Sequence, residues 1–382
     1  MTADTPTRRR AALANPELDR AIAEAESQAI IIWRGEQVRF DAIPERIARI
    51  DGRDDRDRLY GAYNDALEAI NPLYERRLTS WTAGGDVISA TVKGGLDPAA
   101  MAVDLERFIL HVETPYYAAL RRYLALIDIE QGDATEADLW HIIRGGAWTR
   151  WFGDREVRRA VLAAGRTISD STYVDGWRVA EQHLAQQPDV GDPVVARAVS
   201  SAYTTLVGSP QWLADELGVV ADEVAPFADF VAFVHLARLR RAVAELQFEI
   251  RLFSSDDPAI QRAYYSGIVG HMIGVAVHEA GYLASVPRPF ASARGLQSAI
   301  LGGMLIEALE QRHGLHWWRD PASAQLVASV AGASAVTDAL AELGYDALDW
   351  RPVLRQIRTR LIGEMSGYGG PNITTRAGTR KV

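Results

Sequence analysis

The chain has 382 residues, of which 48% are hydrophobic, and this suffices to bury a large core in one domain or in two to three smaller ones. It contains no cysteine, which excludes disulfides, thiolate metal sites and cysteine nucleophiles. The formal net charge of -9 argues against nucleic acid or an anionic membrane as the main partner.

Periodic apolar residues predict helices along most of the chain. Residues 234–250 show the pattern well, because their apolar side chains recur at spacings of three or four while Arg241 and Glu245 can pair on the other side. The sequence therefore predicts a mainly α fold. Comparable helical patterns cover residues 9–28, 54–79, 98–131, 135–165, 172–187, 193–218, 257–285, 291–313, 320–344 and 350–364.

Signals for strands are few and short. IIIW before RGEQ, followed by VRF, predicts a small hairpin. DVISATVK, which follows Gly84 and Gly85, predicts another short strand. The tail, residues 366–382, is rich in glycine and polar residues and predicts a flexible end or a lid.

The beginning of the chain lacks the pattern of a signal sequence. MTADTPTRRR is followed by an acidic amphipathic segment rather than by an apolar one, and no run approaches eighteen apolar residues. We expect a cytoplasmic protein that does not use a membrane as partner. RDDRDR, residues 53–58, is mixed in charge and predicts the solvated start of a helix rather than a binding patch.

HEAGY, residues 278–282, is one residue short of the zinc-binding pattern HExxH, because Tyr282 stands where the second histidine belongs. If residues 257–285 form one helix, His271 and His278 are about 10 Å apart along its axis, too far to share an ion. We therefore expect histidines that are hydrogen-bonded within a helical bundle, and no metal.

Several segments, in order along the chain, carry a longer resemblance. They read DRDRLYGAYNDALEAINPLYERRL, TEADLWHIIRGGAWTRWFGDREVRRAVLAAG, GSPQWLADELG, LRRAVAELQFE, YLASVPRPFASARGLQS and HGLHWWRDPASAQLV. They resemble the oligoendopeptidase F or thimet-oligopeptidase-like family of zinc metallopeptidases. This implies a large helical, gluzincin-type single domain with an internal cleft. An N-terminal helical lobe would span 1–170, and a C-terminal lobe with the former catalytic cleft would span 171–365.

The same resemblance implies that the zinc site is degenerate. GWRVAEQHLAQQ overlies the family's HExxH helix, so that Gln182 and Gln186 replace the two histidines and His183 replaces the catalytic glutamate. GDPVVARAVS overlies the helix of the third ligand, where Arg197 replaces a glutamate. Since amides bind zinc poorly and a guanidinium cannot be deprotonated to bind a cation, no metal and no other cofactor is expected.

Residues that border the cleft in the family are changed as well. By this resemblance, Ala291 and Gly295 stand where the family has two tyrosines, and Gln297 stands where the family has an arginine. Further substrate contacts are expected from four residues, namely Glu249, Tyr264, Tyr265 and Arg288.

Two classes of function follow from these substitutions. In the first, Arg197, Gln182 and Gln186 form a partly buried pocket that holds a small anionic substrate, free or on a carrier protein. His183 is the general acid or base of this non-hydrolytic enzyme of specialised metabolism. Leaving-group elimination or intramolecular amine ring closure would need no metal. In the second, the protein is an inactive pseudopeptidase that binds peptide or a second protein subunit.

Overall fold

The computed structural model describes residues 15–143, 192–217, 221–254, 258–320 and 322–361. Nearly all of the described chain is helical, and the one sheet in it has two short strands, which confirms the mainly α fold. None of the helices in these ranges is long and apolar enough to cross a membrane. The predicted lobe boundary at 170–171 and the tail at 366–382 lie outside the described residues.

The first half of the fold begins with a helix and a hairpin and continues with two long helices, α4 and α6. Its elements are α2 (Pro16–Gln28), β1 (Ile30–Trp33), β2 (Glu36–Arg39), η1 (Phe40–Ala42), α3 (Ile43–Ala48), α4 (Arg53–Thr82), α5 (Val87–Lys93), α6 (Pro98–Ala125), η2 (Gln131–Asp133) and α7 (Glu136–His141).

The second half is built on the longest helix described, α12. Its elements are α10 (Pro193–Thr205), η4 (Leu206–Gly208), α11 (Pro210–Leu217), α12 (Ala221–Leu252), α13 (Pro258–Ile273), η5 (Glu279–Gly281), α14 (Ala291–His313), η6 (Trp317–Arg319), α15 (Ser323–Ala331), α16 (Val336–Leu343) and α17 (Arg351–Leu361).

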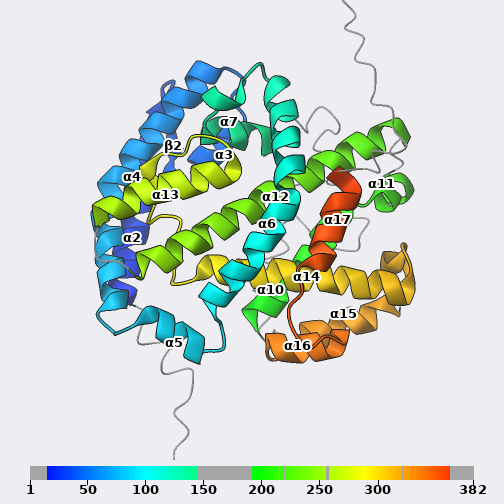
Figure 1. Ribbon diagram of the computed structural model, residues 1–382. Helices are drawn as coiled ribbons and strands as arrows, with labels where there is room; N and C mark the ends of the chain where they lie inside the picture. Colours follow the sequence, from blue (N-terminus) through cyan, green and yellow to red (C-terminus); the bar gives the residue numbers. More distant parts are fainter. Residues whose placement is uncertain (1–14, 144–191, 218–220, 255–257, 321, 362–382) are drawn as a thin grey trace, which may run out of the picture.

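Helix α12 runs diagonally through the middle of the molecule (Figure 1). It packs against α6, α13, α14 and α17, and most of its apolar side chains are buried. Phe233 stacks on Tyr116 of α6 with ring centroids 5.7 Å apart, and Phe248 meets Tyr265 of α13 edge to face. The predicted stripe of residues 234–250 is therefore core, as expected, but the helix is covered on several sides rather than on one.

The hairpin predicted at IIIW and VRF is confirmed. Ile30 pairs with Arg39 and Trp33 with Glu36 in an antiparallel ladder. The two turn residues, Arg34 and Gly35, have φ of 51 and 83°. Positive φ at both positions gives the turn the twist that a two-residue hairpin requires.

The strand predicted at DVISATVK is wrong, because this segment forms helix α5. The Asp86 side chain accepts a hydrogen bond from the backbone N–H of Ser89 at 3.1 Å, which caps the first turn. Gly95, with φ of 89°, follows the last turn. Local capping thus overrides the β propensity of the valines and the isoleucine.

The helix predicted over 257–285 ends at Ile273, so the expected straight helix through HEAGY is wrong. Gly274 has φ of 75°, and a Cβ there would lie 2.7 Å from Leu120 Cδ2 and from Tyr117 Cε1. Only glycine fits this position without strain.

The last carbonyls of α13 are bonded by three side chains. Tyr117 donates to the carbonyl of His271 at 2.6 Å, Arg240 Nε to that of Met272 at 2.6 Å, and Tyr116 to that of Ile273 at 2.7 Å. These donors replace the amides that a continuing helix would have supplied. They also fix the end of α13 against α6 and α12.

Two other predicted helices are divided. The segment predicted at 193–218 forms α10 and α11, because Pro210 starts a new helix after the turn η4. The segment predicted at 320–344 forms α15 and α16. In contrast, the prediction of a helix at 291–313 matches α14 at both ends.

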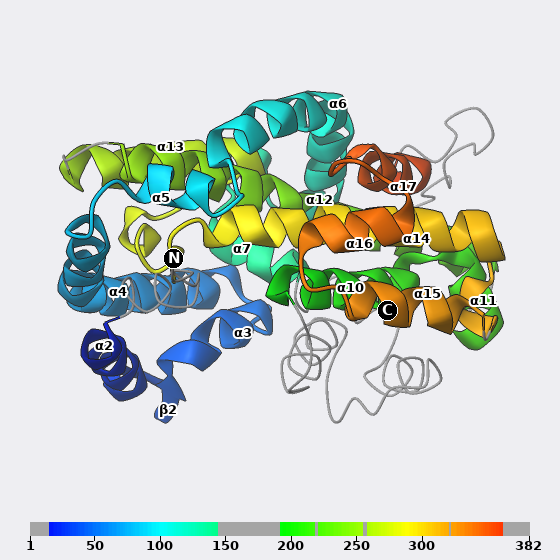
Figure 2. The ribbon, with the colours of Figure 1, turned by 90° about the horizontal axis from the view of Figure 1, so that it is seen from below.

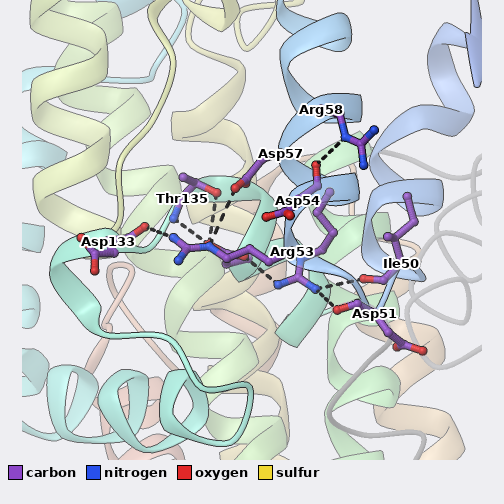
Figure 3. Close-up of polar contacts among 10 residues, drawn as sticks. Ile50, Asp51, Arg53, Asp54, Asp57, Arg58, Asp133 and Thr135 are labelled. Atoms are coloured by element: carbon purple, nitrogen blue, oxygen red, sulfur yellow. Dashed lines mark hydrogen bonds and ion pairs between the residues drawn. The ribbon is translucent and has the colours of Figure 1, made fainter.

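RDDRDR does start a helix, α4, but one of its arginines is buried, so the expectation that the whole run is solvated is wrong. Arg56 is 2% exposed and Asp138 of α7 is 0% exposed, and they form an ion pair at 2.9 Å. Arg56 also donates to the carbonyls of Ile50 and Asp51. Figure 3 shows these two acceptors beside Arg53 and Asp57 at the start of α4. The pair attaches the start of α4 to α7.

We expect Asp138→Ala to lower the free energy of unfolding by about 3 to 5 kcal/mol, because it leaves the Arg56 guanidinium buried without its carboxylate. Asp65→Ala is the control, because Asp65 is exposed on α4, the helix that carries Arg56. This variant should change the free energy of unfolding by less than about 0.5 kcal/mol. Urea unfolding of both variants measures this, and equal effects would contradict the assignment of the ion pair.

Candidate functional site

The three residues that the resemblance places on the former HExxH helix lie outside the described residues. These are Gln182, His183 and Gln186. Arg197 lies on α10, where its side chain is exposed although its neighbours Ala196 and Ala198 are buried. The expectation that Arg197 is partly buried is therefore wrong, and an anion at Arg197 would be bound at the surface of α10.

Helix α10 lies directly against α14, as Figure 2 also shows. A Cβ on Gly302 would be 2.9 Å from the carbonyl oxygen of Ala198 and 3.1 Å from Ser201 Oγ. The absence of a side chain at Gly302 thus allows the two backbones to approach closely. This contact fixes the helix that carries Arg197.

A buried polar network lies on one face of α12, where residues four apart point the same way. Arg241 forms an ion pair with Glu136 of α7, and Glu136 Oε2 accepts a hydrogen bond from Tyr60 of α4 at 2.8 Å. Burial lowers the pKa of Arg241, but the Glu136 carboxylate more than offsets this, so the pKa is raised. Burial, with Glu136, raises the pKa of Tyr60, so the phenol stays a donor.

Arg241 also joins the next turn of α12 to α13. Its Nε lies 2.8 Å from Glu245 Oε1, which confirms the predicted pairing, and its Nη2 donates to the Tyr265 hydroxyl at 3.3 Å. Burial raises the pKa of Glu245 and of Tyr265, against the opposing effect of Arg241. The side predicted to be polar therefore contacts other helices, although Arg241 and Glu245 remain partly exposed.

One further turn along α12, Glu249 is completely buried. Its Oε1 accepts a hydrogen bond from the backbone N–H of Ser292 in α14 at 3.2 Å. Its Oε2 has no hydrogen-bond partner among the described residues. Burial raises the pKa of this carboxyl to about 8, so it is mostly protonated at neutral pH.

Of the four predicted substrate contacts, Glu249 and Tyr265 are buried, but Glu249 contacts α14 whereas Tyr265 contacts Arg241 of α12. Tyr264 is half-buried, and the Arg251 guanidinium lies 5.9 Å from the centre of its ring. Arg288 is exposed in the loop before α14. Sequence reasoning missed Glu136 and Tyr60 as partners of Arg241, since nothing local relates residues so far apart in the chain.

The HEAGY segment lies beside α4 in a short turn. His278 is exposed, and its Nδ1 accepts a hydrogen bond from the N–H of Ala280 at 3.1 Å, while His271 is exposed at the end of α13. The expectation of histidines hydrogen-bonded within the bundle is therefore wrong. Tyr282 is buried and donates to Glu75 at 2.8 Å. Within the described ranges, no three histidine or acidic side chains are grouped so that they could hold a metal ion.

Among solved structures, the fold is similar to the crystal structure of oligoendopeptidase-F from Enterococcus faecium. The TM-score is 0.62 at 13% sequence identity, and the alignment covers 91% of this chain and 71% of that one. No protein-family model matches the chain, and neither does any curated protein. The likeness establishes a metallopeptidase-like helical fold, as the sequence predicted.

If Glu249 has the raised pKa that its burial implies, Glu249→Gln should stabilise the protein more strongly as the pH rises. Below about pH 4.5 the carboxyl is protonated in both states and the variant should match the original chain. Between about pH 4.5 and 8 only the unfolded state is ionised, so the original chain loses up to about 1.4 kcal/mol per pH unit. Above about pH 8 the difference should stay constant at a few kcal/mol.

Urea unfolding at a series of pH values measures this difference. Glu24→Gln is the matched control, because Glu24 is exposed on α2. Parallel stability profiles for the original chain and Glu249→Gln would refute the assignment of a protonated carboxyl.

Proposed function

We propose that the protein is a metal-independent, non-hydrolytic enzyme on a metallopeptidase-like scaffold. It would act on a small anionic or carrier-bound amino-acid-like substrate, in specialised-metabolite biosynthesis. The observation that carries the proposal is the place of Arg197. It is an exposed cation on α10, the helix on which the resemblance puts the third zinc-binding carboxylate.

The replacement of a carboxylate by a guanidinium reverses the sign of the ion that this position can bind: a carboxylate binds a cation, and a guanidinium binds an anion. A guanidinium keeps its charge and presents several N–H donors, which suit a carboxylate, phosphate or sulfate group. Helix α10 is held firmly on α14 at Gly302, so that the arginine is presented from a rigid element. This supports the interpretation that Arg197 binds an anion rather than being a surface residue without a function.

The proposed chemistry is assigned to the preceding segment. His183 would exchange a proton with the substrate near neutral pH, and Gln182 and Gln186 would donate or accept hydrogen bonds to it. Elimination of a leaving group, or ring closure by an internal amine, needs a base and a fixed geometry. Both reactions are compatible with an anion held by Arg197.

A different observation favours the second candidate, a pseudopeptidase that binds peptide or a partner subunit without turnover. Glu136 is bound on one side by Arg241 and on the other by Tyr60. Groups satisfied in this way stabilise a fold and are poorly placed to react. Both candidates predict the loss of peptide hydrolysis, and turnover of a small anionic substrate would separate them.

The purified protein should contain far less than about one zinc ion per chain, because two glutamines and an arginine would not form a tetrahedral zinc site. Metal analysis and melting curves with and without a chelator measure this, and the melting temperature should not change. A library of quenched fluorescent peptides should remain uncleaved with or without added zinc. Stoichiometric zinc, or efficient cleavage, would refute the proposed loss of the peptidase site.

Arg197→Ala should reduce the affinity for sulfate or phosphate by roughly tenfold, the lower range for a charge-assisted contact because the side chain is exposed. A thermal-shift titration measures the affinity, and the melting temperature without anion should be unchanged. Arg121→Ala is the control, since Arg121 is an exposed arginine on α6. If both variants bind anions like the original chain, Arg197 is not the anchor.

A further inference from the structure

The beginning of α14 lacks a cap of its own. The residue at the N-cap position is Phe290, which has no side-chain acceptor, is fully buried and has φ of 53°. A left-handed conformation is strained for a bulky aromatic residue, and a phenylalanine cannot bind the first amides of the helix. The ring of Phe290 lies against that of Phe253, the residue after α12, with centroids 5.2 Å apart.

The missing acceptor is supplied from α12 by Glu249. Its Oε1 lies 3.2 Å from the backbone nitrogen of Ser292, the second residue of α14. The other oxygen, Oε2, is buried without a hydrogen-bond partner among the described residues. A carboxylate left in this state would have one oxygen uncompensated, whereas a protonated carboxyl carries no net charge to bury.

The charged and titratable groups around Glu249 do not neutralise it. Burial raises the pKa of Glu249. The side chain and the backbone N–H of Ser292 lower it, as does Arg294 on α14, but burial, together with Glu245 on α12, outweighs them. From α13, the Tyr265 hydroxyl accepts a hydrogen bond from Arg241.

We propose that Glu249 is a proton-dependent latch on the first turn of α14. The protonated carboxyl keeps the turn closed on α12, and loss of the proton favours an open state in which the carboxylate reaches water. The strained conformation of Phe290 favours opening, because it is relieved when the turn is released. This proposal does not depend on the reaction that the protein catalyses.

The direction follows from proton linkage. The closed state holds the Glu249 proton up to about pH 8, whereas a hydrated carboxyl loses it near its ordinary pKa of 4.5. Between these values the open state binds fewer protons, so the equilibrium constant for opening should increase about tenfold per pH unit. The segment that is released, residues 291–295, includes the two positions where the resemblance places the family's tyrosines.

Hydrogen–deuterium exchange of a peptide that covers residues 290–296 tests the latch between about pH 5.5 and 7.5. Intrinsic amide exchange already accelerates about tenfold per pH unit, so proton-linked opening should give about 100-fold per unit in the original chain. In Glu249→Gln the increase should return to about tenfold per unit. Glu310→Gln, which changes a half-buried carboxyl near the other end of α14, should leave the steep dependence intact.

The rate distinguishes a local latch from global unfolding. The amides of residues 290–296 should exchange faster than those in the middle of α12, because only the first turn opens. Two results would overturn the latch: a tenfold dependence in the original chain, which needs no variant to interpret, or equal exchange rates in the two segments.

Discussion

The fold depends on the neutralisation of charges that α12 carries through the interior. Arg240, Arg241, Glu245 and Glu249 lie in consecutive turns of a helix that is covered on several sides. Burying an ionised side chain in such a place is costly unless it is paired with an opposite charge or becomes neutral. The four side chains meet this requirement in different ways. Arg241 is paired with carboxylates, Arg240 is bound to a helix end and two aromatic rings, and burial raises the pKa of Glu249. Because the partners come from α6, α7, α13 and α14, these contacts also determine how the helices are arranged.

The same requirement explains why the chain turns where it does after α13. Arg240 needs acceptors, and the exposed carbonyls at a helix C-terminus are the strongest that a backbone offers. The end of α13 at Gly274 supplies them, and the chain that follows pairs with the loop before α7 through the Thr135 and Ala276 bridge. The break in the helix, which separates HEAGY from His271, thus provides an acceptor for a buried arginine that lies 32 residues before Met272.

The sequence predicted those features that depend on neighbouring residues. The boundaries of α14, the Arg34–Gly35 hairpin and the Arg241–Glu245 pair all follow from local periodicity or spacing, and the resemblance predicted the fold class. One prediction failed for a local reason, because the Asp86 cap makes Val87–Lys93 a helix. The other failures of the sequence arise where distant residues determine the structure. The pairing of Arg56 with Asp138 and of Arg241 with Glu136 cannot be derived from composition, and the end of α13 depends on Tyr116 and Tyr117 of another helix. Of the candidate site residues, Glu249 and Tyr265 are buried and Arg197 is exposed.

Helix α14 connects these two regions without making them one site. Gly302 contacts α10, which carries Arg197, whereas Ser292 contacts Glu249, and the contacts are about 15 Å apart along the axis at a rise of about 1.5 Å per residue. The middle of α14 is fixed, because Gly302 lies against Ala198 and Gly303 lies against Val353 of α17 with no room for a side chain. An opening of the first turn at Glu249 should therefore leave α10 in place. The proposed binding of an anion by Arg197 on α10 and the protonation of Glu249 on α12 should consequently be independent of each other.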